Sequence, residues 1–160
     1  MIHRNRSAKV NVKLLAVVVV ALLAIVVSIY AAGQIHRNTL SGLSLEAGKT
    51  AFENQDWPAA SRNFKRYLGR NPDDLDILRK YAESLMATRP LDPGAISGAV
   101  AAYRRIIKLD PQDAAASEKL AALYGGIGNS EELAAVARAR LEHAPDDRKA
   151  PLWLANALVQ

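Results

Sequence analysis

A short phrase built around a proline recurs three times in the chain, and its spacing restricts the fold more than any other feature. The phrases read RYLGRNPDD, RIIKLDPQD and ARLEHAPDD, with their prolines at Pro72, Pro111 and Pro145. Counted in residues, the interval is 39 from Pro72 to Pro111 and 34 from Pro111 to Pro145. A proline closes a helix, because its ring restricts the residue before it and it has no N–H to donate. The chain is therefore expected to end helices at nearly regular intervals.

A second series of positions has the same two periods in another order. Each position is an apolar residue followed by a small one, and the successive spacings are 34, then 39, then 34. Both series fit a repeating unit of about 34 residues, with five additional residues in the second copy. These five lie within MATRPLDPGAISG (86–98), whose prolines and glycines predict a lengthened loop. The four pairs of the series are Ala47–Gly48, Tyr81–Ala82, Leu120–Ala121 and Leu154–Ala155.

Each unit is predicted to be a pair of helices. The segment LDILRKYAESLMA (75–87) has apolar residues on one face, and Asp73 and Asp74 precede it where an N-cap and the helix dipole favour acids. The segment PAASRNFKRYLGR (58–70) has a similar stripe and ends before Pro72. In the third unit, Ser130 is the expected N-cap of the second helix.

This pattern resembles the tetratricopeptide repeat (TPR) family, in which a 34-residue unit carries A-x3-F followed by a proline. The matching positions are Ala60-x3-Phe64 and Ala99-x3-Tyr103, whereas the third copy departs with Leu133-x3-Ala137. The resemblance implies an all-α solenoid of about three TPR helix pairs plus a C-terminal helix. Phe64 and Tyr103 should be buried where units meet. The expected TPR-like domain is 41–160, with repeats at about 41–74, 75–113 and 114–147 and a final helix at 148–160.

The N-terminal part predicts a single transmembrane helix. Residues 14–33 contain no charge, and as a helix of 20 residues they rise about 30 Å, the thickness of the hydrocarbon core of a bilayer. The tail 1–13 carries Arg4, Arg6, Lys9 and Lys13, so the positive-inside rule places it in the cytoplasm. After a short linker at 34–40, the repeats would lie in the periplasm of a bacterium, tethered to its inner membrane. A cleavable signal peptide is the alternative, although the apolar run is longer than is typical of one.

The charge balance does not predict a nucleic-acid partner. The chain has 21 Lys and Arg residues against 16 Asp and Glu, a formal net charge of +5. Four of these basic residues belong to the tail 1–13, which has no acid, so the rest of the chain carries only +1. Binding to phosphates needs a basic patch on the folded part, and the bulk charge alone does not indicate one.

No catalytic, metal or cofactor site is predicted, and the chain is not expected to be an enzyme. The sequence has no phosphate-binding glycine loop and no HExxH or GxSxG motif. Cysteine is absent, which excludes thiolate sites. The histidines His3, His36 and His143 lie far apart, whereas a metal site needs several converging ligands.

The resemblance implies binding of other proteins on a concave face made largely by the first helix of each pair. One group of TPR proteins grips the C-terminal carboxylate of a chaperone there, but Leu45, Glu83 and Glu118 stand at positions where that clamp needs polar or basic groups. A mixed apolar and charged lining instead predicts docking of a helix or extended segment. The expected partner-binding groove is Leu45, Lys49, Phe52, Arg79, Glu83, Met86 and Glu118, with Ala122, Leu152 and Asn156 beside them.

The final helix should be less polar on its outer side than a capping helix usually is. Leu152 and Trp153 are apolar there, which indicates a contact with a partner or a second copy, or an array that continues. The predicted function is a membrane-tethered scaffold that recruits or orders membrane-associated proteins, as in envelope or cytochrome assembly or export machinery. The alternative is an accessory structural subunit whose anchor packs against other transmembrane helices. The sequence leaves open whether the protein forms a homo-oligomer.

Overall fold

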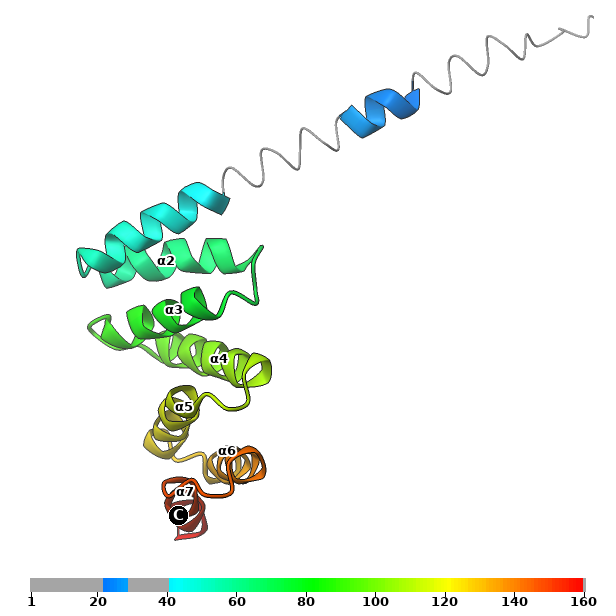
Figure 1. Cartoon of the computed structure of the whole chain (residues 1–160). Coiled ribbons are helices and arrows are strands. Elements are labelled where there is room, and N and C mark those ends of the chain that lie inside the picture. Colours follow the sequence, from blue (N-terminus) through cyan, green and yellow to red (C-terminus); the bar gives the residue numbers. More distant parts are fainter. Residues whose placement is uncertain (1–21, 29–40, 160) are drawn as a thin grey trace, which may run out of the picture. The chain divides into compact units, whose positions relative to one another are not determined.

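The structure is a computed structural model that describes residues 22–28 and 41–159 (Figure 1). The chain divides into two compact units, Met1–Leu40 and Ser41–Gln160. In the first unit, residues 22–28 form a helix whose leucine, isoleucine and valine side chains are all more than half exposed. The Ser28 Oγ atom donates a hydrogen bond to the Ala24 carbonyl oxygen at 2.8 Å, so its hydroxyl is satisfied within its own helix.

The expected membrane span falls largely outside the described residues. Within 22–28 and 41–159, no helix combines the length and the apolar character that crossing a bilayer requires. Of the predicted span 14–33, only 22–28 is described, and the tail 1–13 and the linker 34–40 are outside the description as well.

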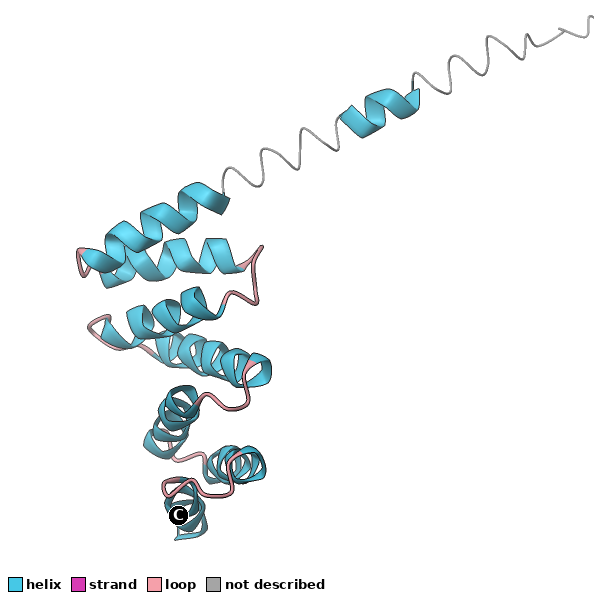
Figure 2. Ribbon diagram, in the orientation of Figure 1, coloured by secondary structure: helices cyan, strands magenta, loops and turns pink. Residues whose placement is uncertain are grey.

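The second unit is a stack of antiparallel helix pairs, and its described residues contain no strand (Figures 1 and 2). Each helix packs mainly on the helices before and after it in the sequence, and α5 also touches α7. This nearest-neighbour arrangement is that of an all-α solenoid. The helices are residues 41–53, α2 (Trp57–Leu68), α3 (Leu75–Ala87), α4 (Pro93–Leu109), α5 (Ala114–Gly126), α6 (Ser130–His143) and α7 (Ala150–Val159).

Aspartate and asparagine side chains cap the starts of helices α2 to α6, and Asp147 accepts the N–H of Ala150 at the start of α7 in the same way. Each accepts a hydrogen bond from the backbone N–H three residues further on, at 2.8–3.2 Å, which satisfies one of the free donors at a helix start. Ser130 was expected to be the N-cap of α6, but it is the first helical residue and Asn129 is the cap. The five capping residues are Asp56, Asp74, Asp92, Asp113 and Asn129.

The additional residues of the second repeat lengthen a helix more than a loop, contrary to the expectation for 86–98. Helix α3 continues to Ala87 and α4 already begins at Pro93, so α4 has 17 residues against 12 in α2 and 14 in α6. Proline suits the first position of a helix, because its missing N–H would have no partner there. Gly98 then lies inside α4, where a Cβ atom would come within 2.8 Å of a Leu85 methyl group, so glycine lets α3 and α4 approach closely.

The first repeat is built around Phe64, which is 0% exposed as predicted. Its ring centroid lies 6.0 Å from that of Phe52. Its ring also fills the space beside Gly48, where a Cβ atom would come within 2.7 Å of a ring carbon. The small residue of the first helix and the large residue of the second therefore form one close contact.

The other two repeats bury the corresponding positions. Tyr103 is 8% exposed, which confirms the prediction that it is buried. In the third repeat Leu133 and Ala137 are 2% and 0% exposed, so the large and the small side chain exchange places without exposing the stripe. Cores tolerate such an exchange when the total volume is kept.

Replacing Phe64 with alanine should cost about 3–5 kcal/mol of unfolding free energy, because it removes a fully buried ring and leaves a cavity beside Gly48. Urea unfolding followed by far-UV circular dichroism measures the loss. The neighbouring exposed Lys65→Ala is the control, with an expected change within about 0.5 kcal/mol. A Phe64→Ala variant as stable as this control would contradict the packing described.

Candidate functional site

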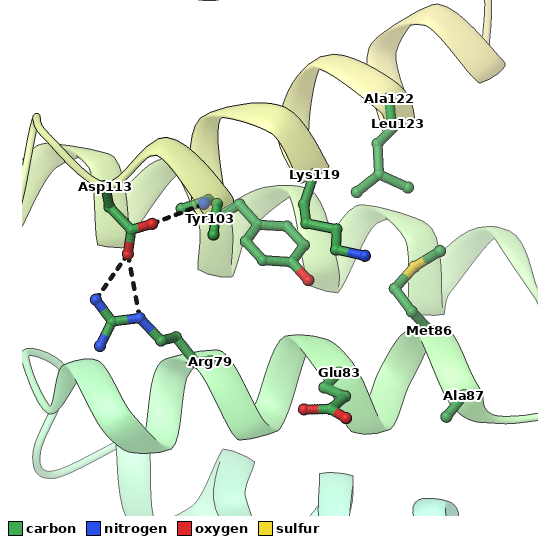
Figure 3. A pocket seen from close by; sticks show the side chains of 11 residues that line it. Arg79, Glu83, Met86, Ala87, Tyr103, Asp113, Lys119, Ala122 and Leu123 are labelled. Carbon is green, nitrogen blue, oxygen red and sulfur yellow. Dashed lines mark hydrogen bonds and ion pairs between the residues drawn. The ribbon is translucent and has the colours of Figure 1, made fainter.

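A groove of about 800 Å³ lies between α3 and α5, where the second and third repeats meet (Figure 3). Helices α3 and α5 are the first helices of their pairs, so the groove is on the face that the resemblance predicted for binding. Its volume is within the range of about 300–1,000 Å³ usual for small-ligand pockets. The lining residues are Arg79, Glu83, Met86, Ala87, Tyr103, Asp113, Ala115, Ala116, Lys119, Ala122 and Leu123.

One end of the groove is apolar. Met86 of α3 and Leu123 of α5 lie at the end away from Arg79, one from each wall (Figure 3). Both are partly buried and pack against the core cluster, so their positions are set by the fold. Flexible methionine side chains adapt to the shape of an inserted group. This end could therefore hold an apolar side chain of a ligand.

The Tyr103 ring, from α4, lies between the two walls (Figure 3). Burial raises the pKa of its hydroxyl above the usual value, and the negative charges of Glu83 and Asp113 raise it further. The hydroxyl is therefore protonated at neutral pH and can donate a hydrogen bond to a ligand.

Arg79 and Asp113 form the polar end of the groove. The Arg79 Nε and Nη2 atoms donate to Asp113 Oδ2 at 3.1 and 2.6 Å, while Asp113 Oδ1 accepts the Ala116 N–H at 2.8 Å. One carboxylate thus caps α5 and binds α3. Burial alone would raise the pKa of Asp113, but the hydrogen bonds from Ala116 and Arg79 outweigh it and hold that pKa below the ordinary value.

Two charged side chains in the groove are available to a ligand. Glu83 and Lys119 are exposed, and neither side chain forms a hydrogen bond or ion pair within residues 22–28 and 41–159. They belong to opposite walls (Figure 3). The groove can therefore pair with a cation and an anion at once, which suits a polar peptide better than a ligand of one charge.

Three of the predicted groove residues, Arg79, Glu83 and Met86, line this groove, as does Ala122. Lys49 and Glu118 do not. Lys49 forms an ion pair with Glu46 of its own helix at 3.2 Å. Glu118 forms one with Lys149 at 2.6 Å, which links α5 to the start of α7. Motif position alone assigned both residues to the groove and could not indicate these partners.

Leu45 and Phe52 also lie outside the groove, because they pack on the core of the first repeat. Phe52 meets Trp57 edge-on, with ring centroids 5.4 Å apart, in addition to its contact with Phe64. These aromatic contacts pack Phe52 within the first repeat, and it does not line the groove between α3 and α5.

Sequence reasoning missed Tyr103, Asp113 and Lys119 as groove residues. The sequence predicted Tyr103 only as a core residue. A large ring between two helix pairs can be mostly buried and still have one edge in a groove. Asp113 ends the repeated phrase in the same place as Asp74, and this equivalence was a usable signal for a helix cap. Nothing in the pattern singled out Lys119.

The apolar surface of α7 differs from the one expected. Trp153 is half-buried and packs against the core cluster, so it is not an exposed anchor. Leu152 is 68% exposed, as expected, and Leu158 and Val159 are 76% and 87% exposed. Trp153 thus faces the core, whereas the smaller apolar residues are exposed.

Metal binding has no support in the described part of the chain, where no three His, Asp or Glu side chains gather to hold an ion. In the groove, the charged groups alternate in sign, and two of the four already pair with each other. The arrangement can recognise a polar segment by shape and charge.

Replacing Asp113 with asparagine should test the link between α3 and α5. Asparagine keeps a capping oxygen but loses the charge that holds Arg79, so we expect a cost of about 1 kcal/mol at pH 7, and up to about 2 kcal/mol for Asp113→Ala. Because the pKa is lowered in the folded state, this stabilisation is complete above the ordinary value of 3.8 and is lost as pH falls through the folded pKa. Urea unfolding should therefore show the gap between wild type and Asp113→Asn closing at low pH. A gap that is the same at pH 7 and pH 3 would contradict this.

Neither a protein-family model nor a curated protein sequence matches this chain. Solved structures do. The TPR domain of Arabidopsis OM64 has a TM-score of 0.50 and 15% identity, over 73% of this chain and 93% of that domain. The TPR2B domain of yeast Sti1, in a complex with pHsp70, has a TM-score of 0.51 and 17% identity, over 76% of this chain and 98% of that one. MamA of Desulfovibrio magneticus RS-1 has a TM-score of 0.53 and 21% identity, over 75% of this chain and 65% of that one. At these identities the likeness concerns the fold, and the second unit accordingly has the fold of a TPR solenoid.

Proposed function

We propose that this protein is a protein–protein interaction scaffold that binds a segment of another protein in the groove between α3 and α5. The observation that carries the proposal is the groove itself. It combines an apolar end at Met86 and Leu123 with unpaired charges at Glu83 and Lys119. Apolar anchors with charges at the rim are a common way of binding a helix or an extended peptide.

The similar structures support a protein partner of this kind. One of them, Sti1 TPR2B, is in a complex with pHsp70. The present groove has Glu83 on its α3 wall, and its other carboxylate, Asp113, is already paired with Arg79. A free C-terminal carboxylate could pair with Lys119, but it would leave Glu83 without a cation and would be repelled by it. An internal segment that brings a basic side chain to Glu83 and an acidic one to Lys119 fits better.

The scaffold is proposed to be tethered to a membrane by residues 14–33, with its N-terminus in the cytoplasm of a bacterium and its repeats in the periplasm. The support is the uncharged run of 20 residues, the basic tail before it, and the exposed apolar side chains of the helix at 22–28. A tether raises the effective concentration of the groove for membrane-associated partners. Assembly of envelope proteins or cytochromes, or export, would use a scaffold of this layout.

A second role in assembly is favoured by α7. Leu152, Leu158 and Val159 are each more than two-thirds exposed on this last helix. A cluster of exposed apolar side chains usually marks an interaction site. The proposed assembly contact therefore consists of the exposed Leu152, Leu158 and Val159 of α7, while Trp153 packs against the core cluster.

Filling the groove should abolish capture of the partner without unfolding the chain. Ala122 is exposed and lines the groove, so Ala122→Trp should block it and weaken capture at least about tenfold, as a loss of about 1.4 kcal/mol or more would do. Ala101→Trp, at an exposed position of α4 outside the groove, is the matched control. The measurement is quantitative pull-down from detergent-solubilised native membranes, with melting temperatures recorded in parallel. Equal capture by the two variants would exclude the groove as the binding site. Arg79→Glu is a poorer test, because it also disrupts the ion pair with Asp113.

The topology makes a separate prediction. A reporter that is active only in the periplasm, fused after Gln160, should be active, whereas a reporter that is active only in the cytoplasm should be silent. Removing the positive charges of the tail, by changing Arg4, Arg6, Lys9 and Lys13 to glutamine, should reduce the correctly oriented fraction. A cytoplasmic reporter active at Gln160 would overturn the proposed orientation, and a soluble mature chain would instead indicate a cleaved signal peptide.

A further inference from the structure

Every charged side chain of α2 is basic. Arg62, Lys65 and Arg66 are exposed on this helix, and Arg70 is exposed just after it. None of the four side chains forms a hydrogen bond or ion pair within the described part of the chain. Their spacing places Arg62, Arg66 and Arg70 in one row, on the side of the helix away from the buried Phe64.

A helix can be kept soluble by a mixture of acidic and basic residues, so solubility does not explain a row of basic residues alone. Helix α3 mixes signs and pairs Lys80 with Asp76 at 2.8 Å. In α2, like charges four residues apart repel each other. Basic residues near a C-terminus do interact well with the helix dipole, which accounts for Lys65 and Arg66 but not for Arg62 in mid-helix. Helices α3 and α5 end without any basic residue in the last turn, so the fold does not depend on such an arrangement.

The two acidic residues that follow the row in sequence, Asp73 and Asp74, are already engaged. Asp74 caps α3 with one oxygen and accepts the Tyr67 hydroxyl with the other, at 2.9 Å. Asp73 forms an ion pair with Arg105 of α4. Helix α4 likewise has only basic charged residues, so it offers no acid to the row, and its Arg104 and Arg105 are themselves paired with acids. The basic row is therefore left for an external anion.

We propose that the surface formed by Arg62, Lys65, Arg66 and Arg70 rests on an anionic lipid bilayer. The row lines neither the groove between α3 and α5 nor the smaller cleft between α4 and α6, so it suits a flat surface better than a peptide. Of the three aromatic residues on α2, Phe64 is buried, Trp57 meets the ring of Phe52 edge-on, and the Tyr67 hydroxyl is bonded to Asp74. None of them is fully exposed beside the row, as stacking on bases would require.

The proposed anchor explains why a bilayer would be close. If residues 14–33 span the membrane, a linker of seven residues extends at most about 25 Å, so the first repeat begins within that distance of the bilayer and can reach its surface. This step rests on the proposed function. Basic residues attract anionic headgroups only within about a Debye length, roughly 8–10 Å at moderate salt, so contact needs this proximity.

The absence of cysteine allows a direct test with a single fluorescent label. Gly69 is exposed at the end of α2 with an ordinary helical backbone (φ −60°), so Gly69→Cys reports on this surface. Label at Ala139→Cys, exposed on α6, is the reference position. The full chain is placed in vesicles of phosphatidylcholine alone, or with about a third phosphatidylglycerol, each containing a headgroup quencher.

Quenching of the label at position 69 should be at least about twofold greater on the anionic vesicles, while the label at 139 should not respond. Raising the salt to about 0.5 M should remove the difference. The double variant Arg62→Glu/Arg66→Glu should remove it too. The control Arg138→Glu/Arg148→Glu makes the same change of charge at exposed positions elsewhere and should keep it.

Equal quenching on both kinds of vesicle, or quenching that Arg62→Glu/Arg66→Glu does not change, overturns the proposal. So does a preference of the row for RNA or an acidic peptide over phosphatidylglycerol vesicles. If the full chain does not float with phosphatidylcholine vesicles, the anchor fails on its own. In that case, binding to anionic vesicles that Arg62→Glu/Arg66→Glu abolishes still supports the surface, and no binding to them overturns it.

Discussion

An apolar stripe that no helix pair can cover by itself is the constraint on which the rest of the structure depends. Each pair buries one side internally and leaves another for the next pair, so stability comes from contacts between neighbours. Within a pair the two helices must also approach closely, and glycine allows this in the first and second pairs. Gly48 admits the ring of Phe64, and Gly98 admits a methyl group of Leu85. The buried residues therefore form one continuous cluster along the stack.

Polar groups link each pair to the preceding one. The capping aspartate before α3, α5 and α7 recurs at the same two intervals as the prolines, and in each case one oxygen accepts backbone N–H groups. The other oxygen binds a side chain from an earlier helix, at 2.6–2.9 Å. The start of each first helix is thereby tied to the preceding repeat, although the partner differs every time. The aspartates are Asp74, Asp113 and Asp147, and their partners are Tyr67, Arg79 and Arg140.

Periodicity predicted the helix pairs and the buried positions well, because both depend on spacing along one helix face. The expected helix 75–87 is α3 itself, and Phe64 and Tyr103 are buried. The expectations that differ from the structure concern features that depend on contacts between helices. The added residues of the second repeat were expected to form a loop, because proline and glycine are common in loops. Proline is also common at the first position of a helix, and here Asp92 caps a helix that begins at Pro93. Phe52 read as a groove residue, because motif position does not show that Trp57 lies against it.

The first and the second helices of the first two pairs carry different charges, and this separates two proposed tasks, binding a protein segment and contacting a bilayer. The groove is lined mainly by the first helices of two pairs, with charges of both signs, whereas α2 and α4 carry only basic charges. In a solenoid each helix contacts mainly its neighbours, so a change on the outer side of α2 has little means of disturbing α5. Binding in the groove would then not change the affinity of α2 for a bilayer. The orientation of the groove relative to α2 would nevertheless be fixed. A surface that orients α2 would also determine which way the groove faces, since Asp74 binds Tyr67 of α2 and Asp113 binds Arg79 of α3.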